Sequence, residues 1–256
     1  MLKSMFSAFL MYSRIPVPPV EWKEENRRFS LCFFPIIGAV IGALYMAWRF
    51  VSVKFGLNEL LTGAGAVVVP VLVTGGIHLD GFCDVSDAKA SYGNTEKRLE
   101  IMKDSHIGAF AVINLIIYFV LQTALFSQVQ NWHTTGIIAV GFVMSRALSG
   151  LTAVTFRTAK KTGSLQDFTE TAHKQITIIV LTIIVVICCG VMIFFDIFSG
   201  ITCVISIIFM AIYYKKFSYG TFGGITGDLS GWFLQMCEIT TLAGAVAGEV
   251  LEGIIK

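Results

Sequence analysis

Three aspartates spaced along one short stretch are the residues of this chain best suited to chemistry. Asp80, Asp84 and Asp87 occur in residues 75–87, GGIHLDGFCDVSD, at the end of a long apolar run. In a helix, positions i, i+4 and i+7 fall within an arc of about 60°, so the three carboxylates would share one face. Like charges this close repel unless a cation stands among them, and Mg²⁺ favours such oxygen ligands. The spacing therefore predicts a metal site, with a solvated helix end paired to Lys89 as the alternative.

A second polar cluster, residues 100–108, lies at the start of a later apolar segment. Asp104 could cap the helix that follows, because aspartate is a favoured N-cap residue. It could instead complete the metal shell, while Lys103 meets phosphate oxygens as a point charge. Both roles for Asp104 stay open from the sequence.

Two further polar features lie later in the chain. Arg146 falls inside an apolar segment, where a cation needs an anionic partner, either a bound anion or a carboxylate such as Glu238. Residues 223–231, GGITGDLSG, place Thr226 and Asp228 at the start of the last apolar segment. A glycine-rich turn there can offer backbone N–H groups to phosphate, provided that a metal offsets the carboxylate. His78 lies about 160° from the aspartate face of a continuous helix, so its expected role is secondary.

The elements that must position these groups are membrane helices. With 55% hydrophobic and 14% charged residues, this chain of 256 is too apolar for a soluble domain, in which about 25% charged residues is ordinary. Lipid supplies no partners for backbone polar groups, so spanning runs must be helical. Seven segments reach the roughly 20 residues that a span requires: 29–48, 58–79, 107–130, 136–156, 176–195, 197–214 and 229–250. We predict an all-α, polytopic bundle of one domain, 1–256, with six spans if the last segment is re-entrant.

Charge placement predicts the orientation of the bundle. Lys and Arg concentrate before the first span and in the loops after the second, fourth and sixth spans. By the positive-inside rule the N-terminus is cytoplasmic, and every polar cluster above then lies on the cytoplasmic side. Residues 1–13 are predicted to form an interfacial helix, because their apolar side chains share a face and no signal-peptide cleavage site follows.

The cysteines and the overall charge exclude other classes. The six cysteines show no C-x-x-C spacing and lie mostly within apolar segments, so neither a disulfide framework nor a zinc site is expected. The formal net charge is only +2 and no basic tract occurs, which argues against a nucleic-acid partner.

Taken together, the motifs resemble those of the cobalamin synthase family, the adenosylcobinamide-GDP ribazoletransferases. The resemblance covers most of the chain and is carried by these segments in order: Arg14–Pro18, Phe34–Gly38, Gly75–Asp87, Met102–Ser105, Ser145–Arg146 and Gly224–Asp228. Two positions depart from the family pattern. The family usually has Arg at the position of His106 and a smaller residue at that of Cys83, which puts a phosphate contact at position 106 in doubt.

The resemblance implies a Mg²⁺-dependent transfer in a prokaryotic cytoplasmic membrane. Adenosylcobinamide-GDP and α-ribazole, or its 5′-phosphate, would give adenosylcobalamin, or its 5′-phosphate, and GMP. Asp80, Asp84 and Asp87 would hold the metal, and Asp104 would be a further ligand or the base. The residues expected to contact substrate are Arg14, Lys103, Arg146, Thr226, Asp228 and His78. Membrane lipid and a second copy of the chain are the other expected partners.

Two other classes stay open. CDP-alcohol phosphotransferases also arrange spaced aspartates around metal on membrane helices, but their signature continues Asp-Gly-x-x-Ala-Arg, whereas Ala88-Lys89 follows Asp87 here. An ion-coupled transporter would also carry intramembrane charges. Such proteins often show paired broken helices in repeated halves, a pattern that the sequence does not display.

Overall fold

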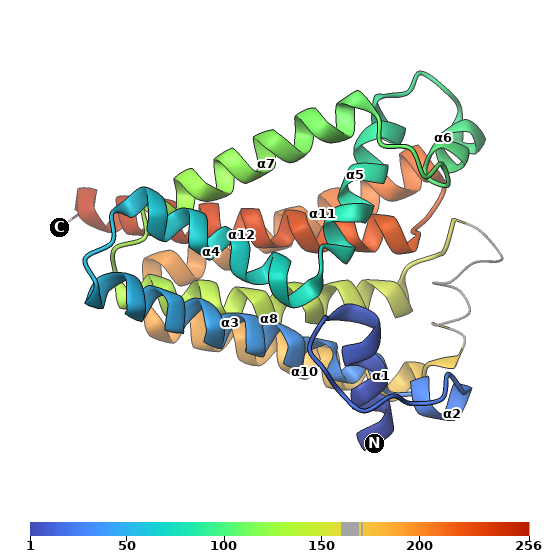
Figure 1. Ribbon diagram of the computed structural model, residues 1–256, viewed down its shortest axis with the longest axis horizontal. Coiled ribbons are helices and arrows are strands. Elements are labelled where there is room, and N and C mark those ends of the chain that lie inside the picture. Colours follow the sequence, from blue (N-terminus) through green and yellow to red (C-terminus); the bar gives the residue numbers. More distant parts are fainter. Residues whose placement is uncertain (160–168, 170, 256) are drawn as a thin grey trace.

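The computed structural model shows an elongated helical bundle (Figure 1). It describes residues 1–159, 169 and 171–255; Lys160 and Lys161, which contribute to the predicted orientation, lie outside the described residues. Its helices are α1 (Leu2–Tyr12), α2 (Glu24–Arg27), α3 (Ser30–Lys54), α4 (Glu59–Thr74), α5 (Ile77–Ala90), α6 (Thr95–Ile101), α7 (Ala109–Ser127), α8 (Trp132–Thr155), α10 (Lys174–Phe195), α11 (Ile197–Phe222) and α12 (Gly227–Ile255). The all-α prediction is confirmed.

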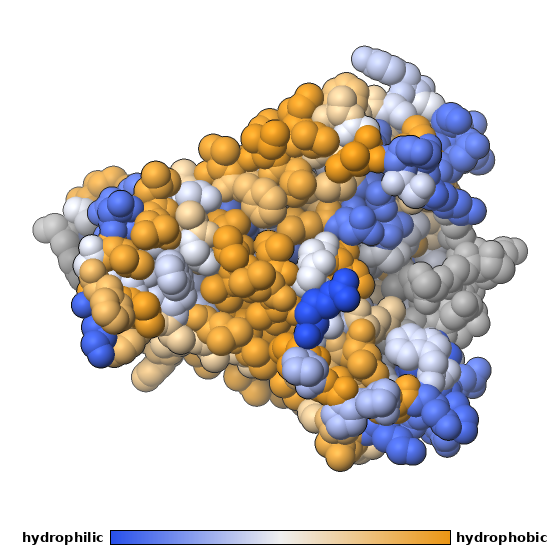
Figure 2. All heavy atoms as spheres, viewed as in Figure 1, coloured by the Kyte–Doolittle hydropathy of each residue, from blue (hydrophilic) through white to orange (hydrophobic). Residues whose placement is uncertain are grey.

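Five of the helices, α3, α7, α8, α10 and α11, are long and apolar enough to cross a membrane. Apolar residues cover the middle of the molecule in Figure 2, and hydrophilic residues gather at the end where α2 and α6 lie. Large aliphatic side chains such as Ile116 on α7 and Ile179 and Val186 on α10 are exposed, as expected of surfaces that face lipid. These features indicate a multi-pass membrane protein.

The predicted continuous span 58–79 is wrong. α4 ends at Thr74, and Gly75 and Gly76 adopt left-handed φ angles of 66° and 80°, which glycine adopts without steric cost. α5 then begins at a bend of 100° to α4, so the pair forms at most one broken or re-entrant span. The two glycines thus turn the aspartate-bearing helix sharply away from the direction of α4 (Figure 1).

The seventh predicted span, 229–250, lies within the 29-residue helix α12. α12 is not among the helices that pass as spans by length and composition. The described residues therefore contain five candidate spans, or six with the α4–α5 pair, and the predicted count of seven is not confirmed. Its polar side chains Gln235, Glu238 and Thr241 are buried, because α12 packs between α5, α8 and α11. Protein neighbours and not lipid therefore surround its polar face.

The predicted helix at 1–13 is α1, which packs against α3 and buries Phe9. Its position at a membrane interface stays a prediction. Immediately after it, the backbone N–H of Arg14 donates to the carbonyl of Val73 at 2.7 Å, which ties the N-terminal segment to the end of α4. The N-terminal segment and the glycine turn therefore meet at one place.

Candidate active site

α5 carries the three aspartates on one face, as the spacing predicted. Asp80 is exposed, while Asp84 and Asp87 are half-buried. Beside them Gly81 touches the first turn of α12: a Cβ at Gly81 would stand 2.7 Å from the backbone oxygen of Asp228. This close approach makes Asp228, Asp80 and Asp87 the charged neighbours of Asp84. Four carboxylates from two helices are thus gathered.

The gathered carboxylates have the chemistry that Mg²⁺ requires. Within the described residues, the carboxylates of Asp80 and Asp84 have no hydrogen bond or ion pair, so their mutual repulsion is not offset by a protein cation. The described residues contain no group of three or more His, Cys, Asp or Glu side chains placed to hold a metal ion, so the predicted shell of three or four carboxylates is not preformed. Mg²⁺ is commonly held by one or two carboxylates, waters and substrate phosphates. The donor set therefore fits a metal that binds together with a phosphate substrate.

Asp87 has a structural role that the sequence did not reveal. Its Oδ2 accepts the Gly108 N–H at 2.7 Å and its Oδ1 accepts the Ala111 N–H at 2.8 Å. These are otherwise unpaired donors at the start of α7, so Asp87 caps that helix from a distant part of the chain. Asp87 thereby fixes α5 to α7.

Asp104 and Lys103 lie apart from the aspartate face, in the exposed loop between α6 and α7. The carboxylate of Asp104 accepts hydrogen bonds from the His106 backbone N–H at 3.0 Å and from its imidazole at 2.7 Å, and these bonds lower the pKa of Asp104. Asp104 therefore does not cap α7, and it is not among the charged neighbours of Asp84. Neither residue lines the two cavities described below.

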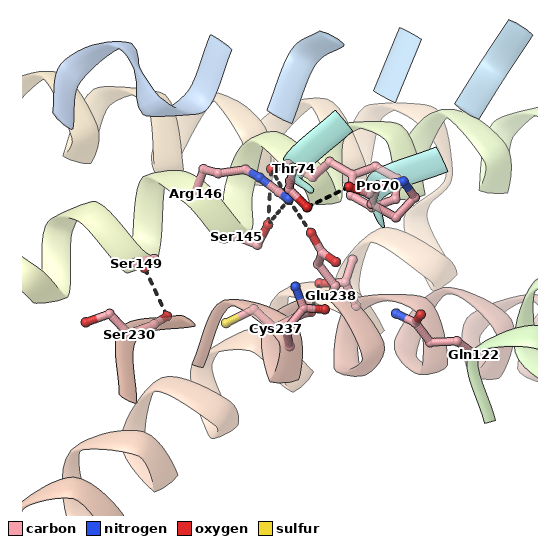
Figure 3. A network of polar contacts seen from close by, with 12 residues as sticks. Pro70, Thr74, Gln122, Ser145, Arg146, Ser149, Ser230, Cys237 and Glu238 are labelled. Atoms are coloured by element: carbon pink, nitrogen blue, oxygen red, sulfur yellow. Dashed lines mark hydrogen bonds and ion pairs between the residues drawn. The ribbon is translucent and has the colours of Figure 1, made fainter. Parts of the chain in front are cut away.

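Arg146 is fully buried on α8 and forms an ion pair with Glu238 of α12, which is one of the two predicted alternatives (Figure 3). Its Nη1 also donates to the Phe142 carbonyl at 3.2 Å and to Ser145 Oγ at 3.0 Å. Arg146 lines neither cavity near Asp80, so contact with a substrate phosphate is not supported. The residue joins α8 to α12 behind the site.

Two backbone N–H groups of the glycine-rich turn before α12 are not free for phosphate. The Ile225 N–H donates to the Arg157 carbonyl at 2.9 Å, and the Gly224 N–H donates to the Ser218 carbonyl at 3.2 Å. Thr226 Oγ1 accepts the Leu229 N–H at 3.2 Å and so caps α12. The Gly224 and Ile225 N–H groups are thus used within the chain, and a phosphate contact by the rest of the turn stays a prediction. The turn places Gly227 and Asp228 in the wall of the smaller of the two cavities described next.

Two adjoining cavities meet at Asp80. The smaller, of about 190 Å³, is lined by Tyr12, Phe34, His78 and Asp228 among others. The larger, of about 620 Å³, includes Arg14 in its wall. Both cavities share Met11, Ile77 and Asp80. The structure thus brings the predicted residues Arg14 and His78 to the site, together with two aromatic residues that were not predicted there. Tyr12 lies in no marked motif, and Phe34 opens the segment Phe34–Gly38, which carried the family resemblance but no site prediction.

The side chain of Arg14 lies over the glycine turn between α4 and α5. A Cβ at Gly75 would stand 2.5 Å from Arg14 Nε, so glycine at this position serves both the left-handed turn and the seating of the guanidinium. Arg14 is exposed, and among the described residues it forms no ion pair. Its charge is therefore available to an anion in the larger cavity.

Comparison with known families identifies the family of this chain. The model of the family described as cobalamin-5-phosphate synthase matches residues 4–246, nearly the whole chain. The chain belongs to the cobalamin-5-phosphate synthase family. Family members named adenosylcobinamide-GDP ribazoletransferase include one from Lachnoclostridium phytofermentans, 43% identical over 99% of this chain and 96% of its own length. A relative of the same name from Clostridium perfringens is 32% identical over 99% of this chain and 98% of its own length. No solved structure matches.

Membership in the cobalamin-5-phosphate synthase family makes this chain an enzyme of cobalamin synthesis, a transferase. The CDP-alcohol phosphotransferase and transporter alternatives are therefore not supported. The family resemblance expected from the motifs is confirmed over almost the entire length.

Proposed function

We propose that the protein joins adenosylcobinamide-GDP to α-ribazole, or to its 5′-phosphate, and releases GMP. A ribose hydroxyl of ribazole attacks the corrinoid-linked phosphorus, the new P–O bond forms, and the P–O bond to GMP breaks. The names of the relatives support this reaction. The observation that carries it in this chain is the carboxylate cluster of Asp80, Asp84 and Asp228 beside the cavity that Arg14 lines.

Mg²⁺ is part of the proposal, with Asp84 and its first charged neighbour Asp228 as the residues that would hold it. When bound, it supplies neutralisation of phosphate charge and polarisation of the reacting phosphoryl group. Arg14 binds phosphate oxygens in the larger cavity, and Asp80, in the wall common to both cavities, accepts the proton of the attacking hydroxyl. Asp87 keeps α5 in place through α7. In this scheme Asp80, Asp87 and Asp104, all predicted as ligands, are not assigned to the metal.

The proposal includes the location, a prokaryotic cytoplasmic membrane with the N-terminus and the site on the cytoplasmic side. Basic residues at the end of the molecule that holds α2 and α6, among them Arg27, Arg28, Lys97 and Arg98, support this orientation. Soluble nucleotide substrates and GMP would then enter and leave from the cytoplasm without crossing lipid. A second copy of the chain stays a predicted partner.

The test is an assay of GMP release by the purified protein in lipid nanodiscs, with adenosylcobinamide-GDP, α-ribazole 5′-phosphate and Mg²⁺. We expect EDTA to abolish release and Asp84→Asn to reduce it on the order of 100-fold or more, the size found when one group that stabilises transition-state charge is removed. The matched control is Asp104→Asn, because the Asp104 carboxylate is exposed and lies apart from the cluster; this variant should release GMP at the wild-type rate. Full activity in Asp84→Asn, or turnover of a CDP-alcohol in place of the corrinoid nucleotide, would refute the proposal.

A further inference from the structure

The smaller cavity beside Asp80 has aromatic walls that phosphate chemistry does not require. The rings of Tyr12 and Phe34 lie 4.3 Å apart between centroids. The imidazole of His78 stands 6.1 Å from the Tyr12 ring and 5.6 Å from the Phe34 ring. Leu31 and Ala153 add further apolar lining. Surfaces of this kind favour a flat aromatic ligand, because ring faces and edges attract one another.

His78 gives the cavity a polar group that lacks a partner. Its side chain is 6% exposed, and among the described residues its Nε2 has no hydrogen bond. The two serine hydroxyls of the same wall are already used, since Ser149 Oγ donates to the Ser230 carbonyl at 3.2 Å and Ser230 Oγ donates to the Thr226 carbonyl at 2.9 Å. A buried polar atom without a partner is costly, and a ligand that pairs with it removes that cost.

We propose that this cavity binds the benzimidazole ring of the ribazole substrate, with the His78 imidazole hydrogen-bonded to the free ring nitrogen. The inference rests on the proposed function and assigns one of its two substrates to a place. A cavity of about 150 Å³ holds benzene, so one of about 190 Å³ suits a fused bicyclic ring and is far too small for a corrin. Linked to its ribose, benzimidazole keeps one acceptor nitrogen, which matches one imidazole N–H.

Guanine, the other flat base among the substrates, matches this cavity less well. The carboxylates of Asp80 and Asp228 in the wall could accept its N–H groups, but its carbonyl oxygen and ring nitrogens would also need donors when buried. The Ser149 and Ser230 hydroxyls of the wall already donate to backbone carbonyls. Benzimidazole, with one polar atom, leaves nothing unpaired once His78 has bonded to it.

The two cavities then explain how the substrates meet. With its base in the smaller cavity, ribazole places its ribose at the wall formed by Met11, Ile77 and Asp80. The phosphates of the corrinoid nucleotide lie beyond that wall, in the larger cavity next to Arg14. Hydroxyl and phosphorus thus meet at the wall that holds Asp80, and in-line displacement then requires the GMP oxygen to lie on the far side of the phosphorus from the hydroxyl.

The test narrows the cavity without touching a charged group. Ala153 lines the smaller cavity and is 5% exposed, so Ala153→Leu fills part of its volume. We expect the KM for ribazole to rise about 10-fold or more, the effect of a few misplaced methyl groups in an apolar pocket, with the KM for adenosylcobinamide-GDP unchanged. The riboside of unfused imidazole should lose less than ribazole does. Ser13→Leu, which lines only the larger cavity, is the matched control and should affect the nucleotide KM alone.

Other outcomes would overturn the assignment. A raised KM for adenosylcobinamide-GDP alone in Ala153→Leu would place guanine in the cavity, and unchanged constants for both substrates would show that neither base binds there. Should Ala153→Leu not fold, His78→Phe serves as the second variant, with the same expected rise in the KM for ribazole. Equilibrium binding of ribazole alone separates this inference from the reaction: if no GMP is released, binding by the wild-type protein that Ala153→Leu weakens still supports the cavity, and absence of binding refutes it.

Discussion

Loss of Glu238 should destabilise this protein far more than loss of the whole Arg146–Glu238 pair. The side chains are 0% and 3% exposed, so neither charge can recover water if its partner is removed. Nε and Nη2 of Arg146 already lack hydrogen-bond partners among the described residues, and only the Phe142 carbonyl and Ser145 Oγ would remain for Nη1. Removing one member of a buried pair typically costs about 3–5 kcal/mol. Glu238→Leu should therefore consume a large part of a typical net stability of about 5–15 kcal/mol.

Replacement of both partners should reverse most of this loss. Arg146→Met with Glu238→Leu removes both buried charges and keeps similar side-chain volumes, and such exchanges are often neutral or stabilising. The measurement is denaturant unfolding of the wild-type protein, both single variants and the double variant in one detergent, analysed as a double-mutant cycle. If the double variant loses as much free energy of unfolding as the two single variants together, the reasoning is refuted.

The same double variant also decides between the two roles that the sequence left open for Arg146. If the residue acts only as a structural partner of Glu238, the stable double variant keeps the wild-type KM for adenosylcobinamide-GDP. A stable double variant with a strongly raised KM for adenosylcobinamide-GDP would instead show that Arg146 contacts the phosphates. That result would contradict the structure, in which Arg146 lines neither cavity.

Two further substitutions test how α5 is held. Asp87→Ala removes both acceptors for the Gly108 and Ala111 N–H groups, so the free energy of unfolding should fall by about 1 kcal/mol. The control, Asp104→Ala at an exposed site, should leave the unfolding midpoint unchanged. Equal changes in the unfolding midpoint of the two variants would contradict the capping role of Asp87. Gly81→Ala adds a Cβ 2.7 Å from the Asp228 backbone oxygen, so α5 and α12 must separate, with a loss of about 1–3 kcal/mol and of most GMP release. Gly190→Ala on α10, where a Cβ meets open space, is the control and should leave GMP release intact and slightly raise stability. Equal stability and equal GMP release in the two glycine variants would argue against the close contact of α5 with α12.

Local patterns sufficed where the deciding interaction lies within one segment. The i, i+4, i+7 spacing placed Asp80, Asp84 and Asp87 on one face because α5 is helical as expected. The apolar runs identified the spanning helices for the same reason, since lipid forces each run to satisfy its own backbone. The prediction of a continuous span was wrong at 58–79, because the apolar run continues across Gly75 and Gly76 although the chain bends by 100° between α4 and α5.

Contacts between distant segments could not be read in this way. From the sequence, Asp104 was one candidate cap for α7 because it is a nearby acidic residue, whereas Asp87 reaches that helix through the packing of α5 on α7. Tyr12 lies in no motif, and the segment that begins with Phe34 gave no sign of a site. Only the packing of α1 on α3 makes the two residues walls of a cavity.

The sequence by itself determined that this is a helical membrane enzyme of cobalamin synthesis with a face of carboxylates, because composition, periodicity and motif order are local properties of the chain. Only the tertiary structure decided which groups meet. Gly81 lets α12 approach closely enough to bring Asp228 to Asp84, and the turn at Gly75 lets Arg14 line the same cavity as Asp80. Those contacts depend on the distances between backbone segments that are separated by many residues. Side-chain packing sets these distances, and the spacing of residues along the chain does not encode them.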